Sequence, residues 1–416
     1  MSAAAASLRT DARVIGLVGV AHGLSHFFQL TIPPLFPLLK EEFGVSYAAL
    51  GALLAVFYGV SGVMQTAAGF LVDRVGARAI LLAGLALTAA GTLAAGVAPS
   101  FAWLVVAAAI GGLGNSVFHP ADLALLNGKV DVNRLGYAFS VHGITGNIGW
   151  VLAPLFVVPI AQAHGWRAAL IAAGVLGLVA CALIATQRVL AGELRQPAAA
   201  PGAGAGAAAG IAPLLARPVL LAFLFFFLYA CALVGFQTFL TSALTALHGV
   251  SLVTASTALT AFLIGGAVGI LAGGVVAVRT RRHNLFAAIG VAVPAALSLV
   301  ISVGGLGGPA LVALLALTGF VFGSIGPSRD IIIRAIAPVA ARGKVYGFVY
   351  SGLDLAGLVA PLAFGWALDH GRPDLVFIGS AAFLVAAIPT VLQMRRRDSA
   401  SADGAPTPVR AAGGHQ

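Results

Sequence analysis

The chain has 416 residues, of which 60% are hydrophobic and only 9% are charged. Soluble domains carry about 25% charged residues, so the composition excludes an ordinary soluble enzyme, a disordered chain and a nucleic-acid-binding protein. One membrane-spanning helix needs about 20 apolar residues, and the apolar content is enough for about twelve of them. The formal net charge of +10 must then be explained by where the basic residues lie.

Twelve uninterrupted apolar runs follow one another along the chain. Each is long enough to cross a bilayer as a helix, whereas barrel strands would alternate polar and apolar residues over about ten positions. The fold class is therefore predicted to be all-α integral membrane, with twelve transmembrane helices in two pseudo-symmetric six-helix halves. The runs are approximately 14–38, 47–72, 78–98, 101–126, 135–160, 168–189, 218–246, 252–278, 284–304, 309–333, 343–368 and 375–394.

The composition changes between the sixth and seventh runs. Residues 197–210 contain only Ala, Gly and Pro, which is typical of a flexible linker. We therefore divide the chain into an N-terminal six-helix half (1–189), a cytoplasmic linker (190–217), a C-terminal six-helix half (218–395) and a disordered cytoplasmic tail (396–416).

The basic residues are distributed unevenly over the two sides of this topology. With the N-terminus in the cytoplasm, 20 of the 23 Lys and Arg residues fall in cytoplasmic segments, and only Lys40, Arg167 and Arg372 fall on the opposite side. The positive-inside rule then predicts that both termini are cytoplasmic in a multi-pass inner (plasma) membrane protein of bacterial type. The lipid bilayer explains the basic balance without a nucleic-acid partner.

The two halves contain an internal repeat at a fixed offset of 207 residues. Its matching positions are Pro120 and Pro327, Asn147 and Asp354, and residues 153–155 and 360–362. Two copies with the same six-span topology are parallel repeats related by an axis along the membrane normal, and such an architecture places a solute site at the midplane between the halves.

A charged motif follows the second span, where residues 69–78 read GFLVDRVGAR. It resembles the signature G-x-L-x-D-R-x-G-x-R of the major facilitator superfamily, and the resemblance extends over the whole chain through span count and topology. Residues 118–120 and 146–149 look more narrowly like the fosmidomycin-resistance-type branch. The resemblance implies a transporter that moves a small organic solute or drug-like compound by alternating access.

The signature also defines candidate gating residues, Asp73, Arg74 and Arg78. Gly76 permits a tight turn with positive φ, and Asp73 could pair with Arg78 or cap a neighbouring helix. The resemblance implies that Asp73 latches the two halves together in the outward-open state. The alternative is that these charges only orient the chain.

The first span carries a polar stripe formed by His22, Ser25, His26 and Gln29, spaced i, i+3, i+4 and i+7. Such a stripe is costly against lipid, so it must face the protein interior or a cavity. We predict that His22, His26 and Gln29 contact solute; the alternative is hydrogen bonding between helices. His22 and His26 could also share a metal ion, although no third ligand is near in the sequence.

Further polar positions lie on other central spans. Asn115, His119 and Asp122 form a second stripe on the fourth span, and the remaining solute-binding candidates are His142, Asn147 and Gln237. Asp122 and its repeat-mate Arg329 are candidates for a gating ion pair, with interfacial solvation as the alternative. Gly265, Gly269 and Gly273, at steps of four, are expected to be helix-packing contacts.

Asp354 lies about twelve residues into the eleventh span. An ionised carboxylate there is unfavourable unless it is paired or hydrated, so Asp354 is predicted to carry the coupling proton. The alternative is a buried Asp that hydrogen-bonds to a neighbour such as Ser351.

These observations favour a secondary active transporter, proton-coupled by symport or antiport, with efflux as one direction. Import and export stay open, because Ala153 precedes Pro154 where antiporters of the superfamily carry Gly-Pro. We expect no enzyme activity and no cofactor, with a small-molecule solute, protons and lipid as partners of a monomer. Two alternatives stay open: a membrane-embedded metal-binding protein or enzyme using His22 and His26, and a solute sensor that does not transport.

The topology can be tested with reporter fusions. Fusions at Gly128 and within residues 197–210 are expected to report the cytoplasm, and one at His164 the periplasm, because the basic residues fix the orientation. A periplasmic report from the linker would contradict the division into two halves.

Overall fold

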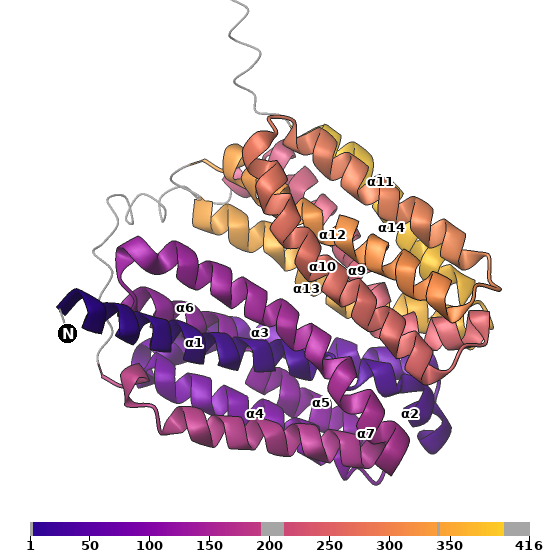
Figure 1. Cartoon of the computed structure of the whole chain (residues 1–416), viewed down its shortest axis with the longest axis horizontal. Coiled ribbons are helices and arrows are strands. Elements are labelled where there is room, and N and C mark those ends of the chain that lie inside the picture. The colour runs from indigo at the N-terminus through magenta and orange to yellow at the C-terminus, as the bar shows by residue number, and fades with distance from the viewer. Residues whose placement is uncertain (1–2, 193–211, 339–341, 395–416) are drawn as a thin grey trace, which may run out of the picture.

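The computed structural model describes residues 3–192, 212–338 and 342–394, and all regular structure among them is helical (Figure 1). The predicted linker and tail lie largely outside the described residues. Eleven helical stretches are long and apolar enough to cross a membrane. The α-helices are α1 (Ala3–Gln29), α2 (Phe36–Phe43), α3 (Tyr47–Val75), α4 (Ala77–Gly96), α5 (Phe101–Asn115), α6 (Phe118–Lys129), α7 (Leu135–Ala185), α9 (Arg217–His248), α10 (Leu252–Arg279), α11 (His283–Ser302), α12 (Gly308–Ile336), α13 (Arg342–Asp369) and α14 (Asp374–Leu392). Short 3₁₀ turns cover Pro33–Leu35, Val132–Arg134, Arg188–Leu190 and Ala212–Leu215.

The stretch α7 contains two spans. Its backbone leaves the helical region at Gly165, where φ is 86° and ψ is 159°. Before this point α7 runs alongside α1, with Gly149 against Gly23; beyond it, Gly174 packs against Leu93 of α4. The chain therefore turns back at Gly165, and the predicted twelve spans in two six-helix halves are confirmed.

Several helix boundaries follow from single residues. Ser46, Ser100 and Ser251 accept a hydrogen bond from the third residue of the helix that follows, at the starts of α3, α5 and α10. Such caps satisfy amide groups that have no partner within the helix. Gly44 and Gly249 end α2 and α9 with φ of 61° and 66°, which a residue without Cβ adopts at little cost.

Glycines bring α10 and α12 into backbone contact. A Cβ at Gly269 would lie 2.0 Å from the Phe320 carbonyl oxygen, and one at Gly319 would lie 1.9 Å from that of Phe262. Gly265 and Gly273 make similar approaches. The prediction that these glycines are packing contacts is confirmed, and the close approach provides van der Waals attraction where lipid gives no hydrophobic drive.

The two halves meet along α3 and α13. A Cβ at Gly51 would lie 2.3 Å from the Pro361 carbonyl oxygen, and one at Gly365 would lie 2.6 Å from that of Tyr47. These contacts join the first part of α3 to the last part of α13. The backbones of the two halves therefore touch at the end of the molecule that carries α2.

The other end of α3 makes no comparable contact within the described residues. A Cβ at Gly62 or Gly69 would meet nothing within 4 Å, and Phe70 is 64% exposed. Figure 1 shows the same arrangement: the purple and orange bundles are close near α2 and diverge toward the end where α1 begins. The molecule is thus closed at the α2 end and open at the end that carries the signature loop, residues 69–78.

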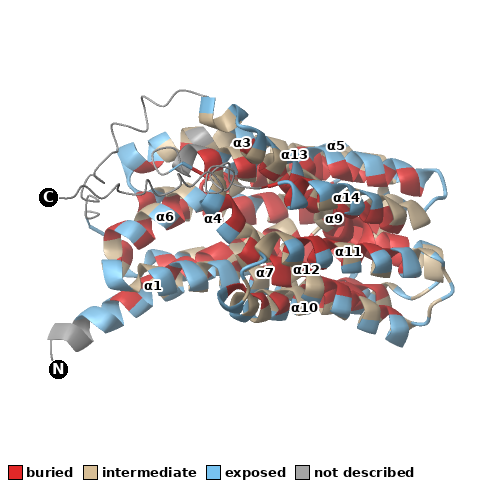
Figure 2. Cartoon of the chain, turned by 90° about the horizontal axis from the view of Figure 1, so that it is seen from above, coloured by how far each residue is buried: buried red, intermediate tan, exposed pale blue. Residues whose placement is uncertain are grey.

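Buried residues line the faces where helices meet, and exposed residues cover the outside (Figure 2). Many of these outer residues are large and apolar, including Leu183, Leu271 and Trp366. Water would disfavour such a surface, whereas lipid tails accept it. The burial pattern is that of a membrane-embedded bundle.

The helix contact can be tested by adding bulk at one glycine. Gly269→Val is expected to lower the free energy of unfolding by about 1–3 kcal/mol or more, because the new side chain must displace backbone. Gly274→Val, on the same helix with nothing within 4 Å of its Cβ, is the matched control. Thermal unfolding in detergent measures both, and equal midpoints would contradict the packing role.

Candidate functional site

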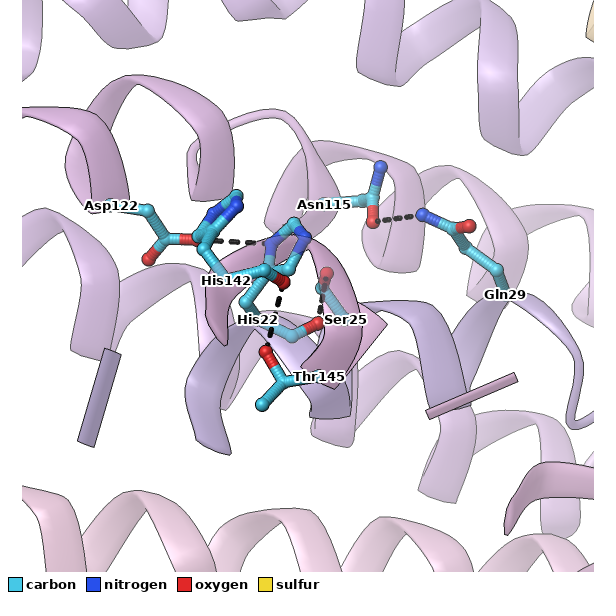
Figure 3. A network of polar contacts seen from close by, with 7 residues as sticks. All are labelled: His22, Ser25, Gln29, Asn115, Asp122, His142 and Thr145. Carbon is cyan, nitrogen blue, oxygen red and sulfur yellow. Dashed lines mark hydrogen bonds and ion pairs between the residues drawn. The ribbon is translucent and has the colours of Figure 1, made fainter. Parts of the chain in front are cut away.

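A buried carboxylate joins three helices of the N-terminal half (Figure 3). The Oδ2 atom of Asp122, on α6, lies 3.1 Å from Nδ1 of His22 on α1 and 3.2 Å from Nε2 of His142 on α7. Asp122 is fully buried, and His22 and His142 are nearly so. We call these three residues the Asp122 cluster.

The charge that the Asp122 cluster can hold is limited by its geometry. An ionised Asp122 only accepts hydrogen bonds, so His22 must present Nδ1–H and His142 must present Nε2–H. The two imidazole rings stack with centroids 3.5 Å apart, and two imidazolium ions at that distance would repel strongly. The arrangement therefore accommodates one protonated His and disfavours two.

One oxygen of the carboxylate has no partner. Asp122 Oδ1 is buried without a hydrogen bond to any described residue, and so is Nδ1 of His26. Buried polar atoms of this kind are rare and costly. The Asp122 cluster is therefore incompletely satisfied in this conformation.

A second polar network lies farther along α1. Gln29 donates to Oδ1 of Asn115 at 3.2 Å and accepts from the Trp150 indole at 3.1 Å, while Asn115 donates to Ser61 at 2.8 Å. These bonds connect α1, α7, α5 and α3. The polar stripe predicted on the first span thus forms hydrogen bonds between helices, and Gln29 within it remains partly exposed.

His26 connects the two networks. Its ring lies 4.6 Å from that of His22 and 4.4 Å from that of Trp150, measured between centroids. Gly146 leaves room for it, because a Cβ there would come within 3.0 Å of the imidazole. The ring of His26 therefore lies between the Asp122 cluster and the Gln29 network.

The histidines could in principle hold a metal ion. One nitrogen from each of His22, His119 and His142 lies within 4.8 Å of the others, and His26, the partner expected from the sequence, is outside this group. A metal must lie close to the plane of each imidazole that binds it. The rings of His22 and His142 stack with centroids 3.5 Å apart and only 22° between their planes, so the two planes meet farther from the rings than the length of a metal–nitrogen bond, about 2 Å. We therefore do not interpret the group as a metal site.

The predicted residues of the C-terminal half lie apart from these networks. Gln237 is buried on α9, with no partner for its Nε2 among the described residues. Asp354 is exposed on α13 and lies near Tyr58 of the other half. Ser351, its expected neighbour, bonds to the Phe348 carbonyl instead.

The predicted gating pair is absent from this conformation. Asp122 bonds to histidines, whereas Arg329 pairs with Asp330 at 3.1 Å, so no ion pair joins Asp122 to Arg329. Asn147 donates to the Gly143 carbonyl of its own helix at 2.9 Å.

The signature loop is free of the partner that the sequence suggested. Gly76 has the expected positive φ, 99°, but Arg78 donates to the Ala185 carbonyl rather than to Asp73. Asp73 and Arg74 are exposed, and Asp73 has no ion pair with any described residue.

The closed end holds an acidic contact that sequence reasoning missed. The two oxygens of Asp369, at the end of α13, accept hydrogen bonds from the backbone amides of Tyr47 and Ala48 at 2.7 and 2.8 Å, and Lys40 lies 3.8 Å away. The carboxylate of one half thus caps the N-terminus of α3 in the other, where the helix dipole favours negative charge. An Asp at a span end gives no sequence signal of its own.

Comparisons with known proteins agree with this architecture. Residues 18–310 and 242–413 match the Major Facilitator Superfamily. The fosmidomycin resistance protein of Escherichia coli is 26% identical over 388 residues, covering 90% of this chain and 91% of that protein. A probable sulfoacetate transporter of Cupriavidus necator is 25% identical over 404 residues, with 91% and 92% covered.

The fold is also found among solved structures. A bacterial homologue of the human lysosomal transporter Spinster, in an inward-facing and occupied conformation, aligns with a TM-score of 0.75 at 14% identity, covering 92% of this chain and 96% of that one. Sequence, span count and fold agree over nearly the whole length. The chain belongs to the Major Facilitator Superfamily and is a multi-pass membrane transporter similar to its fosmidomycin-resistance-type members.

Proposed function

We propose that the protein is a proton-coupled secondary transporter that moves a small organic solute across the inner membrane by alternating access. The observation that carries the proposal is the contact between the halves at the α2 end, which has no counterpart among the described residues at the signature end. Two bundles arranged in this way can expose a site between them to one side at a time.

The orientation follows from the basic residues. The open end carries the Lys- and Arg-rich segments, so the conformation is inward-facing if these segments are cytoplasmic. In the outward-facing state the contact at Asp369 would open, and Asp73 at the other end would latch the halves, with Arg74 and Arg78 as further gating residues.

The proposed solute wall combines the polar residues of both halves. Its members are His22, His26, Gln29, Asn115, His119, His142, Asn147 and Gln237. Among them, Gln29 and Asn115 retain partial exposure, and His119 is exposed. Sulfoacetate, carried by a probable transporter similar to this chain, makes small organic acids the first solutes to test.

Two sites compete for the coupling proton. Asp354, the proton carrier expected from the sequence, is an exposed carboxylate on α13 near Tyr58 of the other half. The Asp122 cluster has a stronger geometric case, because one carboxylate oxygen shared by two imidazoles binds a single proton in a place that water reaches poorly.

Asp122→Asn and Asp354→Asn discriminate between these sites. Removing the coupling group is expected to abolish accumulation driven by a pH gradient while leaving solute counterflow within about 3-fold of the wild-type rate, because exchange needs no net proton movement. We expect this result for Asp122→Asn. Both activities are measured in proteoliposomes, with circular dichroism as the folding control.

Undiminished accumulation by Asp122→Asn and its loss in Asp354→Asn would assign the proton to Asp354. If neither substitution changed accumulation, both assignments would be wrong. Wild-type protein that showed neither counterflow nor accumulation of any solute would falsify the transporter proposal itself.

The contact at Asp369 predicts a shift between conformations. Asp369→Asn is expected to change the ratio of α2-end-open to closed molecules by roughly 2- to 30-fold toward open, since a carboxylate on a helix N-terminus contributes about 0.5–2 kcal/mol. Spin labels at Val97 and Val303, which are exposed at the α2 ends of the two halves, measure the distance between them.

Asp374→Asn is the matched control. Asp374 is an acidic residue five positions later that pairs with Arg372 of the same loop, so its loss should leave the distance distribution unchanged. An unchanged distribution in Asp369→Asn as well would show that this contact does not hold the end closed.

A further inference from the structure

The guanidinium of Arg329 is surrounded by aromatic rings inside the C-terminal half. From α12, its guanidinium carbon lies 4.5 Å from the ring centroid of Phe226, 5.8 Å from that of Tyr229 and 5.9 Å from that of Tyr350. These rings belong to α9 and α13. The side chain is only 17% exposed, so three aromatic faces fix the plane of a nearly buried cation.

Only one edge of this guanidinium has an acidic partner. Nε lies 3.1 Å from Oδ1 of Asp330, and the Tyr350 hydroxyl donates to the same oxygen at 3.0 Å. Within the described chain, the two Nη groups of Arg329 have no hydrogen-bond acceptor. Both Nη groups are accessible to solvent, because neither is among the buried polar atoms that lack a hydrogen-bond partner.

The arrangement exceeds what packing requires. A buried cation needs a counter-ion, and Asp330 already supplies one through Nε. The two Nη groups remain as a planar pair of donors, the geometry that binds two oxygens of one carboxylate, sulfonate or phosphonate.

Arg329 lies toward the open end of the molecule. It lies in the last third of α12, which runs from Gly308 to Ile336 toward the end where the halves have separated. A solute entering from the open end meets this part of α12 before the contacts that close the α2 end.

We propose that the Nη groups of Arg329 bind the anionic head group of the transported solute in bidentate fashion. This inference rests on the proposed transport function and gives it a substrate class: small organic acids bearing a carboxylate, sulfonate or phosphonate. The planar pair of Nη donors, rather than positive charge alone, would determine which solutes bind.

The test is ligand binding to purified protein in detergent, measured by calorimetry and by thermal shift. The probes are sulfoacetate, lactate and methylphosphonate, with lactamide as the neutral partner of lactate. At least one anion is expected to bind the wild type at least 10-fold more tightly than lactamide. Arg329→Gln should weaken this binding about 10- to 100-fold, as the loss of a charge-assisted bidentate contact implies.

Arg329→Lys distinguishes the effect of the planar pair of donors from the effect of the positive charge. It also replaces Arg329→Gln in the binding test if that variant does not fold. It keeps a positive charge but cannot form the planar pair, so binding should still weaken at least 5-fold. Arg334→Gln, an exposed Arg on the same helix, is the control and should bind like the wild type.

Three outcomes would overturn the inference: no probe anion binds the wild type, lactamide binds as well as lactate, or Arg329→Lys and Arg329→Gln bind as the wild type does. A lower unfolding midpoint with unchanged anion affinity would also overturn it, in favour of a purely structural role. Counterflow of neutral solutes by the wild type would distinguish failure of the anion site from failure of the transporter proposal.

Discussion

The Asp122 carboxylate is the interaction on which the N-terminal half depends. Inside apolar helices no water replaces a lost hydrogen bond, so an acidic side chain there must be supplied with donors by its neighbours. Two imidazoles meet this need from α1 and α7, and this fixes how those helices are rotated against α6. The rotation in turn sets the faces of α1 and α7 that carry His26, Gln29 and the second polar network.

Glycines bring helices into backbone contact in both halves, as Gly149 against Gly23 and Gly269 against Phe320 show. The halves differ in their buried charged groups. The N-terminal half contains the Asp122 cluster, whereas in the C-terminal half aromatic rings of α9 and α13 surround Arg329. In the proposed function, the proton would bind in one half and the solute head group in the other, so that the two ligands need not compete for the same atoms.

The sequence was sufficient for the fold and for part of the site. Apolar run length and the 3.6-residue period predict the spans and the polar stripe of α1, because both are local properties. The partners of Asp122 and Arg329 are not local. The 207-residue repeat suggested that these two face each other, but a repeat fixes topology and leaves side-chain direction to packing, which gives each its own partners. Asp369 was missed because only the meeting of two halves places it on the amides of α3.

Each end of the molecule carries an acidic residue, which contacts the opposite half at the closed end and is exposed at the open end. At the closed end, the Asp369 carboxylate occupies the N-terminus of α3 and satisfies two amides that have no partner within the helix. At the open end, Asp73 is exposed and has no such partner among the described residues. A carboxylate gains most on a helix N-terminus when both are withdrawn from water, so in the proposed transport cycle each contact would form only as its end closes. The gain at one end would then accompany a loss at the other. Two conformations balanced in this way would differ by little free energy, and a bound proton or solute would be enough to shift the proposed equilibrium.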